Sequence, residues 1–508
     1  MNKAVVTVVA MSIIFGLWKI EAKEQKPVLS PPIAVAPETK ENLPQYNPQV
    51  AWSSAAKVWL VVWEDGWAAS DETARDGRAQ DIFASRVSVD GKILDPNGIE
   101  VCIARDFQGL PVVASDGKDF LVLWQDMRNG KDWDIYAARV TADGKVLDPN
   151  GFLVCGGEHN QCMPSVVWTG NGYYAVWLDA RNFPEYRVRG MRLSREGKGM
   201  DDSPGIELIR PMTDADIDKW RKASFAPGKH GQGWHNVVLQ PHAPVLTAND
   251  KVCLVLSYAS GWTGGTGEGG RSAGYLLRRI DVATGKPSGP VENLALEASV
   301  ESARWFPAVS TQVYHPALCA TGEHGFLLTA YFHHHGFGAD GNGVRVAYFF
   351  DREGQPRREG NMLSVRLIVR EPHQHGVGYR TYGVRPNTLA LAWDGKRALH
   401  VADRYIVSGN RVDFDYDILG IFIDAEGKRL LDLRSCTTVE SDRIRYNDAS
   451  RKVEEEQARI EPFLIAGGEG RQSRPAVAGG DEGIFLVVWQ EEIPGKNSRI
   501  VARLVEAR

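Results

Sequence analysis

An internal repeat constrains this chain more than any other feature, because a unit that recurs must pack against its own copies. The clearest two copies are residues 111–155, PVVASDGKDFLVLWQDMRNGKDWDIYAARVTADGKVLDPNGFLVC, and residues 164–209, PSVVWTGNGYYAVWLDARNFPEYRVRGMRLSREGKGMDDSPGIELI. Both alternate apolar and polar residues, as Phe120-Leu-Val-Leu-Trp124 does, which indicates β-strands with one buried face. Each unit of about 50 residues is expected to form four strands.

The same order of features recurs along the chain. Units begin near Pro48, Pro111, Pro164, Pro244, Pro316, Pro386 and Pro475. A glycine in the third hairpin of six successive units supplies the positive φ that tight hairpins need; these are Gly91, Gly144, Gly197, Gly285, Gly354 and Gly427. Four antiparallel strands repeated radially are typical of a β-propeller. The sequence therefore predicts an all-β, seven-bladed β-propeller with four antiparallel strands per blade.

The two ends of the chain are expected to meet in the last blade. The unit that starts at Pro475 stops at Arg508 after three strands, and residues 32–36 (PIAVA) are predicted to supply the fourth. This N-terminal strand would remove the open edge of a linear array. Residues 433–460 interrupt the sixth unit as an insertion, in which 448–461 is a candidate surface helix. Residues 23–508 are thus expected to form a single propeller.

The pattern W-x-D … D-I-[YF]-A-x-R-V … D-G-K resembles units of many secreted bacterial β-propeller proteins. The resemblance covers nearly the whole mature chain and points to no specific family. It implies a propeller fold and export. Fold alone does not determine function, which must be argued from the site.

The first residues have the pattern of a secretory signal peptide. Lys3 gives a positive start, Ala4–Trp18 is apolar, and Ala22 offers a small residue for cleavage. We therefore predict a signal peptide over 1–22 and a secreted or periplasmic, monomeric protein without an integral membrane span after cleavage. The alternative is an uncleaved N-terminal anchor, for which the apolar stretch is short.

Composition excludes several classes of protein. A hydrophobic fraction of 43% excludes global disorder, and 59 basic against 64 acidic residues argue against a nucleic-acid binder. The cysteines form no C-x-x-C pair, which excludes a zinc cage of cysteines. Cys155 and Cys162 could form a disulfide or remain free. The cysteines are Cys102, Cys155, Cys162, Cys253, Cys319 and Cys436.

Repetition separates scaffold residues from candidate site residues. Asp65, Asp126 and Asp179 each follow a tryptophan by two positions, so we interpret them as scaffold and expect Arg86 and Arg139 to be their partners. Histidines behave differently: they gather in the loops between second and third strands and between blades, which share one face, here called the loop face. They are His159, His230, His235, His242, His315, His333, His334, His335, His373 and His375.

The residue before the first proline of each unit is expected to lie near the mouth of the central channel. These residues are Asn47, Leu110, Met163, Ala243, His315, Arg385 and Arg474. Guanidinium groups suit carboxylates and sulfates, so we predict an anion-binding face with aromatic stacking platforms. The candidate ligand-binding residues are His242, His315, Arg385, Arg474, Trp262, Trp305 and Arg380. The alternative is that the arginines pair with acidic residues of neighbouring blades.

Three functions remain open, and the sequence does not decide whether the protein is an enzyme. The first is binding of a carbohydrate or another anionic ligand on this face. The second is a polysaccharide lyase with base candidates His333, His335, His373 and His375, acid candidates Tyr379 and Tyr382, and Arg380 or Arg385 as the clamp. A glycoside hydrolase would instead need two carboxylates, from Asp214, Asp216, Glu268, Asp340 and Glu371. The third is a divalent metal held by His333, His335, His373 and His375.

Overall fold

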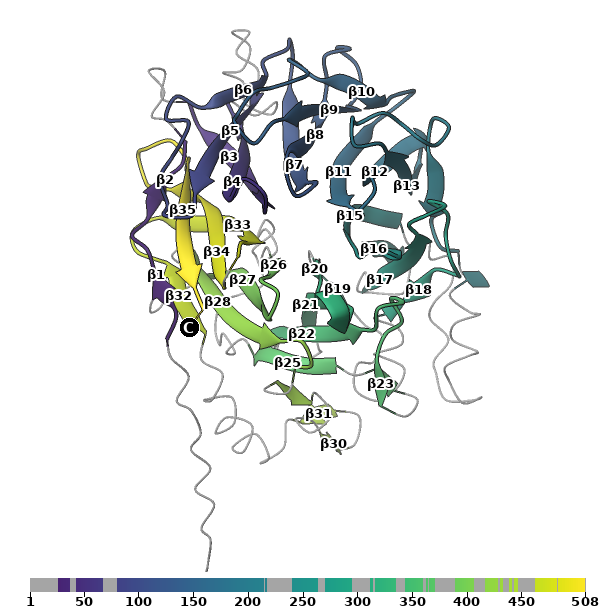
Figure 1. Cartoon of the computed structure of the whole chain (residues 1–508). Coiled ribbons are helices and arrows are strands. Elements are labelled where there is room, and N and C mark those ends of the chain that lie inside the picture. The colour runs from purple at the N-terminus through teal and green to yellow at the C-terminus, as the bar shows by residue number, and fades with distance from the viewer. Residues whose placement is uncertain are drawn as a thin grey trace, which may run out of the picture.

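The strands of the chain are arranged in a ring, as a computed structural model shows (Figure 1). The structure describes residues 26–36, 43–66, 80–213, 215–216, 240–263, 270–294, 311–313, 316–334, 343–359, 362–363, 365–370, 389–405, 416–427, 430–432, 438–440, 443–445, 462–481 and 483–507. Among these residues the elements are almost all β-strands, which confirms the predicted all-β class.

Four sheets of four antiparallel strands follow one another around the ring. The first has β3 (Gln45–Ser53), β4 (Val58–Asp65), β5 (Asp81–Ser88) and β6 (Ile99–Cys102). The second has β7 (Gln108–Ser115), β8 (Phe120–Asp126), β9 (Asp134–Val140) and β10 (Phe152–Cys155). The third has β11 (Gln161–Trp168), β12 (Tyr173–Asn182), β13 (Glu185–Leu193) and β14 (Ile206–Ile209). The fourth has β15 (Gln240–Ala248), β16 (Val252–Thr263), β17 (Gly270–Asp281) and β18 (Glu292–Asn293).

The fifth sheet is larger. It has β19 (Thr311–Val313), β20 (Ala317–Ala320), β21 (Phe326–His334), β22 (Gly343–Phe350), β25 (Val365–Arg370) and β29 (Leu431–Asp432). Two hairpins stand apart from the ring sheets, β23 (Arg358–Glu359) with β24 (Met362–Leu363), and β30 (Thr438–Glu440) with β31 (Arg443–Arg445). A 3₁₀ turn, η2 (Gly322–His324), precedes β21.

The prediction of seven blades is wrong: the ring has the five antiparallel blades described above, and the last two sequence units do not add two more separate sheets. They share one nine-stranded sheet of β26 (Leu389–Trp393), β27 (Arg397–Tyr405), β28 (Tyr416–Asp424), β32 (Phe463–Ala466), β33 (Arg471–Gly479), β34 (Ile484–Glu492), β35 (Arg499–Glu506), β1 (Val28–Leu29) and β2 (Ile33–Ala34). The physical reason is a parallel backbone pairing between Tyr416 and Arg471, which joins the two units. The number of sequence repeats gives the number of similar units, whereas the number of sheets depends on which strands are hydrogen-bonded to one another.

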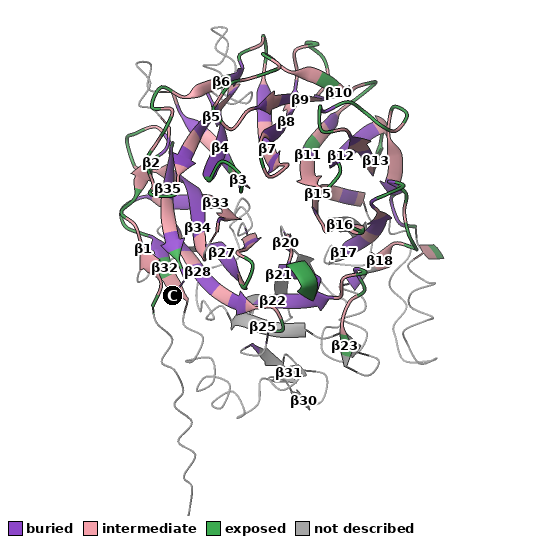
Figure 2. Cartoon of the chain, in the orientation of Figure 1, coloured by how far each residue is buried: buried purple, intermediate pink, exposed green. Residues whose placement is uncertain are grey.

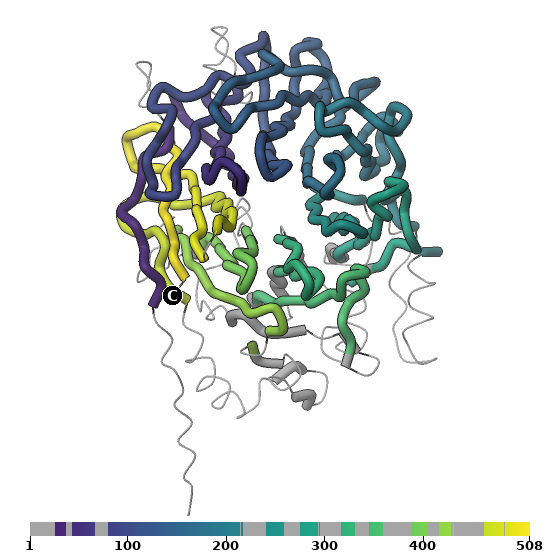
Figure 3. The backbone as a smooth tube through the Cα atoms, viewed as in Figure 1, coloured from purple at the N-terminus to yellow at the C-terminus, as the bar shows by residue number. Residues whose placement is uncertain are grey.

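The N-terminal segment pairs with the C-terminal strand, as the sequence predicts. Ile33 pairs with Ala502 in β35, and Val28 pairs with Glu506. Figure 3 shows the purple N-terminal tube beside the yellow C-terminal one. The edge of β35 is therefore covered by backbone from the start of the chain.

The core lies within and between neighbouring blades, where buried colour concentrates in Figure 2. Trp124 and Val122 from β8 pack with Leu60 and Val62 from β4 in one cluster. The largest buried side chains include the tryptophans of successive units, Trp63, Trp124, Trp177 and Trp489. The recurring tryptophan thus fills the space between sheets, because each blade presents the same apolar face to its neighbour.

Two predicted segments lie outside the described residues. These are the signal peptide over 1–22 and the surface helix over 448–461. Among the residues that the structure does describe, no helix is both long and apolar enough to cross a membrane.

Candidate functional site

Each inner strand in four of the sequence units breaks its pairing at the same place, just before a proline. The breaks lie between Tyr46 and Gln49, Gly109 and Val112, Cys162 and Ser165, and Ser473 and Ala476. The residue before the proline is left-handed in all four, with φ between 49° and 54°; these are Asn47, Leu110, Met163 and Arg474. We call these four the rim residues, because their strands border the centre of the ring (Figure 1).

His242 occupies the corresponding place in the fourth blade. Pro241 pairs with Ala259 and Pro244 with Ser257, so the break spans His242 and Ala243. The residue aligned with the rim is therefore His242, one position before the Ala243 expected from the proline spacing. Its N–H donates to the Ser257 hydroxyl at 3.0 Å.

The left-handed backbone of Met163 gives a direct stability prediction. This conformation costs a residue other than glycine about 1–2 kcal/mol, and asparagine tolerates it best. Because Met163 is 38% exposed, its side chain contributes little packing. We expect Met163→Val to lower the free energy of unfolding by about 1 kcal/mol and Met163→Asn to raise it slightly. Urea titration of both variants checks this, and equal stabilities would contradict it.

The N–H groups of two rim residues are bound by side chains of the preceding blade. Leu110 N–H donates to Glu64 Oε1 at 2.5 Å, and Met163 N–H donates to Gln125 Oε1 at 3.1 Å. Both acceptors stand between the tryptophan and the aspartate of the W-x-D pattern. The residue in the middle of this motif therefore joins each blade to the rim of the next.

Glu64 is a buried carboxylate at this rim, and only 3% of it is exposed. Besides Leu110, it accepts hydrogen bonds from Asn47 Nδ2 at 2.7 Å and Gln80 Nε2 at 2.5 Å. Burial raises the pKa of Glu64 above its usual value, although the hydrogen bonds from Leu110 and Asn47 and the charge of Arg474 act in the opposite direction. Sequence reasoning missed Glu64. A comparison of the middle residues of successive W-x-D motifs would have found it.

Another buried carboxylate, Asp403, occupies the same register position in a different unit. Asp403 pairs with Ile418 across the sheet, as Glu64 pairs with Ile82. It is 3% exposed, and its backbone carbonyl accepts a hydrogen bond from Arg345 Nη2 at 3.1 Å. The W-x-D pattern does not extend to this unit, so no sequence motif pointed to Asp403.

Few of the predicted site residues lie in the described part of the chain. His242 and Arg474 are described fully, and for Trp262 and His333 only the backbone is, within β16 and β21. The others lie outside the described residues: His315, Arg385, Trp305, Arg380, His335, His373, His375, Tyr379 and Tyr382. The structure therefore places two of the predicted binding side chains at the rim and leaves the remaining predictions as they stand.

His242 and Arg474, the two predicted binding residues whose side chains are described, differ in charge. The His242 ring is stacked on Tyr258, with centroids 4.6 Å apart and planes at 10°. Burial lowers the pKa of His242, so its imidazole is neutral at neutral pH. The positive charge at the described rim therefore comes from Arg474, and Glu64 of the neighbouring blade feels that charge.

An exposed aromatic shelf stands on the loop face of the third blade. Phe183, in the turn between β12 and β13, is 61% exposed. The His159 ring lies 5.7 Å from it, and the Tyr186 ring packs against it edge-on at 6.4 Å. We call these three residues the aromatic shelf. His159 was predicted to lie on this face, whereas Phe183 and Tyr186 were not, because the prediction depended on histidines and tryptophans.

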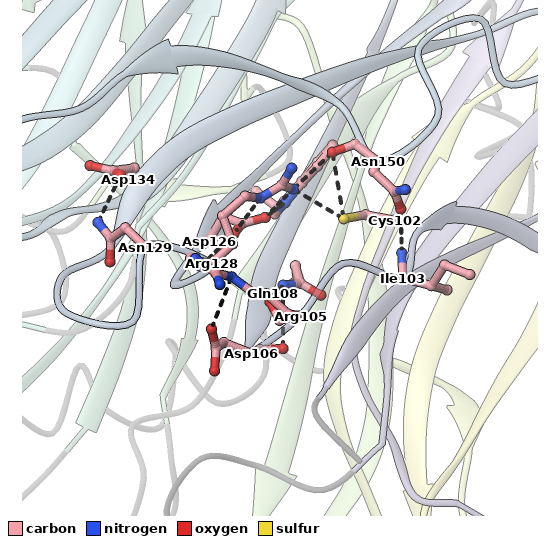
Figure 4. Close-up of polar contacts among 11 residues, drawn as sticks. Cys102, Ile103, Arg105, Asp106, Gln108, Asp126, Arg128, Asn129, Asp134 and Asn150 are labelled. Atoms are coloured by element: carbon pink, nitrogen blue, oxygen red, sulfur yellow. Dashed lines mark hydrogen bonds and ion pairs between the residues drawn. The ribbon is translucent and has the colours of Figure 1, made fainter. Parts of the chain in front are cut away.

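The aspartates of the W-x-D pattern bind locally, as expected for scaffold. Asp126 accepts from the Trp124 indole at 2.8 Å and from Arg128 Nε at 2.8 Å. Figure 4 shows Arg128 reaching further, to the Cys102 thiol at 3.3 Å and the Asn150 carbonyl at 2.8 Å. Each of these contacts is made within the chain's own scaffold.

The predicted partners of these aspartates were wrong. Arg86 forms an ion pair with Asp95 at 2.9 Å, and Arg139 with Asp148 at 2.8 Å. In both cases the aspartate lies nine residues further along, in the hairpin that follows the third strand. The physical reason is the register of the strands. The guanidinium groups of Arg86 and Arg139 reach the turn of their own hairpin. The second-strand aspartates Asp126 and Asp179 instead form ion pairs with the arginine two positions after them.

The first blade carries a carboxyl that titrates near neutral pH. Asp81 pairs across the sheet with Asp65, and burial with the charges of Asp65 and Glu100 raises its pKa to about 7. In the second blade Asp126 corresponds to Asp65, and it forms an ion pair with Arg128, two positions further along. Two positions after Asp65 the sequence has Trp67 in place of an arginine. Asp81 thus combines a shifted pKa with a place at the loop face, which is typical of functional carboxyls.

The hydrolase and metal candidates receive little support from the described residues. Asp216 binds Arg210 at 2.9 Å, and this partner lowers the pKa of Asp216 to about 2, so it stays ionised and is a poor proton donor. Asp214, Glu268, Asp340 and Glu371 lie outside the described residues. Within the part of the chain that is described, no three metal-ligating side chains come together. Cys155 and Cys162 are both free thiols.

The known proteins that resemble this chain are solved structures. No protein-family model matches the chain, and no curated protein matches it. An ulvan lyase of a new polysaccharide lyase family is similar in structure, with a TM-score of 0.48, 9% identity, and coverage of 94% of this chain and 95% of that one. A protein of unknown function from Dyadobacter fermentans has a TM-score of 0.42, 10% identity, and coverage of 95% and 99%. The α-L-arabinofuranosidase Arb93A from Fusarium graminearum has a TM-score of 0.41, 9% identity, and coverage of 95% and 98%. At these identities the likeness concerns the fold alone.

Proposed function

We propose that this protein binds a carbohydrate, and in particular an acidic one, on the loop face of its ring. The observation that carries the proposal is the aromatic shelf of His159, Phe183 and Tyr186. Phe183 is the most exposed large apolar side chain among the described residues, and it stands in a cluster of three rings rather than singly. Flat apolar rings beside polar groups suit the C–H face of a sugar ring, while hydroxyls find polar partners nearby.

The rim supports the acidic part of this proposal. Arg474 is half-buried at the inner edge of the ring, and a guanidinium donates paired hydrogen bonds to a carboxylate or sulfate. Asn47 stands at the corresponding position of the adjacent unit and adds an amide. A saccharide that carries an anionic group would be held by the shelf through stacking and by the rim through directed hydrogen bonds.

Binding of wild-type protein and Phe183→Ala to soluble acidic and neutral polysaccharides tests the proposal. We expect wild type to bind at least one acidic polysaccharide and Phe183→Ala to bind it about tenfold more weakly, because a central aromatic contact is worth about 1.4 kcal/mol or more. The matched control is Leu153→Ala, which removes a side chain that is 55% exposed on the outer strand β10. Equal losses in both variants would contradict a site at the shelf, and no binding by wild type would overturn the proposal.

A second candidate function is cleavage of the bound polysaccharide. The observation that favours it is Asp81, whose pKa of about 7 suits a proton donor that works near neutral pH. Incubation with the bound polysaccharide, followed by assays for new reducing ends and for the ultraviolet absorbance of an unsaturated uronate, separates hydrolysis from elimination. An unchanged polymer would leave binding as the function.

We further propose that the protein is exported and acts as a secreted or periplasmic monomer. The support is the signal-peptide pattern of residues 1–22. N-terminal sequencing of the mature protein is expected to begin at Lys23. Gel filtration is expected to give the apparent mass of a single chain. A mature protein that begins at Met1 in the membrane fraction would contradict export with cleavage.

A further inference from the structure

The boundary between the third and fourth blades departs from the repeat at its loop-face end. In the first two blades, the middle residue of the W-x-D pattern accepts the N–H of the rim residue in the next blade, as Glu64 does for Leu110. The third blade has Leu178 at this position, which is 5% exposed and has no atom that accepts a hydrogen bond. The N–H of His242 therefore takes its acceptor from elsewhere.

Ser257 supplies this acceptor from within the fourth blade. Its hydroxyl accepts the His242 N–H at 3.0 Å and donates to the His242 carbonyl at 2.6 Å. Ser257 is fully buried and pairs with the first residue after the break in its inner strand. At the corresponding position, four other units have an apolar residue: Val62, Leu123, Val176 and Val488. The serine thus departs from the repeat, and it fixes the backbone of His242.

The fourth blade also holds the aromatic shelf of the third. Strands β13 and β15 pack against each other across the boundary, and the Tyr186 N–H donates to Gln240 Oε1 at 3.1 Å. Gln240 lies only two residues before His242, a distance of about 7 Å along a strand. The Tyr186 ring packs against the apolar cluster that contains Leu178. The shelf and the ring of His242 therefore stand on the two sides of one blade boundary.

The rest of the shelf is fixed by hydrogen bonds as well. The Phe183 N–H donates to the Ala180 carbonyl at 2.8 Å, and the Ala180 N–H donates to the Asn160 carbonyl at 2.8 Å. The Gln161 amide donates to the His159 carbonyl at 3.2 Å. The backbone that carries the three rings is therefore tied together before a ligand arrives, which lowers the entropy lost on binding.

We propose that the aromatic shelf and the stacked pair of His242 and Tyr258, here called the rim stack, are two subsites of one track that binds an oligosaccharide segment. Gln240 is the positioning residue that fixes the two subsites relative to each other. This inference rests on the proposed carbohydrate binding and narrows it to chains over single terminal sugars. Because Gln240 and Pro241 lie between Tyr186 and the rim stack, the two subsites are assigned to different sugar units of one chain.

Binding of oligosaccharides of graded length, measured by isothermal titration calorimetry, tests the track. The probes run from single sugars to octasaccharides and are cut from one uronate-containing, one sulfated and one neutral polysaccharide. We expect the affinity of wild type to rise about tenfold or more up to the length that fills both subsites, because the second contact is then made within the same chain. The affinity should stay level beyond that length. Phe183→Ala and His242→Ala should each remove the rise.

The variant Gln240→Leu tests the positioning role, because leucine is similar in size and cannot accept the Tyr186 N–H. We expect Gln240→Leu to bind the long probes about tenfold more weakly and to bind single sugars as wild type does. Gln240→Glu keeps an acceptor oxygen and should restore most of the affinity for the long probes. A merely structural role would weaken the binding of short and long probes equally.

The matched control is Gln108→Leu, the same exchange at the corresponding position of the second blade. There the amide donates to the Arg105 and Asp106 carbonyls, so this variant should keep the length dependence of wild type. Melting temperatures show whether each variant is folded, and the length profile of wild type requires no variant.

The outcomes separate failure of the track from failure of the proposed function. An affinity of wild type that does not change with probe length would overturn the track and leave carbohydrate binding in place. Equal losses for short and long probes in Gln240→Leu would overturn the positioning role of Gln240. If wild type bound none of the probes, the proposed function and the track would both be overturned.

Discussion

Replacement of Asp126 by alanine is expected to lower the free energy of unfolding by about 3–5 kcal/mol, because it leaves a partly buried arginine without its anion. Asp126 is fully buried and accepts hydrogen bonds from the Trp124 indole and from three N–H groups of Arg128. Arg128 in turn holds the Cys102 thiol of the preceding blade and the Asn150 carbonyl. One substitution therefore releases a network that joins two blades.

Thermal and urea unfolding measure this effect, with two further variants for comparison. Asp126→Asn keeps an acceptor for the Trp124 indole but removes the charge, so its stability should fall between those of wild type and Asp126→Ala. Asp90→Ala breaks an exposed ion pair with Lys92 and should leave stability unchanged. If Asp126→Ala were as stable as wild type, the W-x-D-x-R network would not be what joins the blades.

How much of the fold could be predicted follows from what repeats in the sequence. The alternation in Phe120–Trp124 identifies a strand with one face in the core, and the same alternation along the chain indicates an all-β ring. The number of separate sheets could not be predicted in this way. It depends on one backbone pairing, between Tyr416 and Arg471, and neither side chain gives a signal for it.

The candidate site was less predictable than the fold, for a related reason. The spacing of prolines identified Asn47, Leu110, Met163 and Arg474 as residues of one kind, and all four share a left-handed backbone. The same spacing missed His242, because register in the fourth blade is set by the strand pairing of Pro241 and Pro244. Register within the strand pairs, rather than residue type counted over loops, therefore decides which side chains stand at the rim.

Acidification is expected to destabilise the protein through His400, by about 2–4 kcal/mol between about pH 7 and pH 4. His400 in β27 is 1% exposed, and its Nδ1 lies 3.1 Å from the Thr329 hydroxyl of the adjacent sheet. Burial, with the charge of Arg345 adding to it, lowers the pKa of His400 to about 3. Between this value and about 6.5, the unfolded chain binds a proton that the folded chain does not, so stability falls as the pH falls.

Urea unfolding at a series of pH values measures this effect in wild type and in His400→Leu combined with Thr329→Val, which removes both polar groups from the buried contact. We expect the double variant to lose less stability than wild type as the pH falls, since no buried imidazole must stay neutral. Thr329→Val alone is the control and should keep the pH dependence of wild type, because the imidazole is still present. Parallel pH profiles for wild type and the double variant would assign the acid sensitivity to other groups. A steeper fall in wild type would mean that His400 limits the acidity in which this ring stays folded.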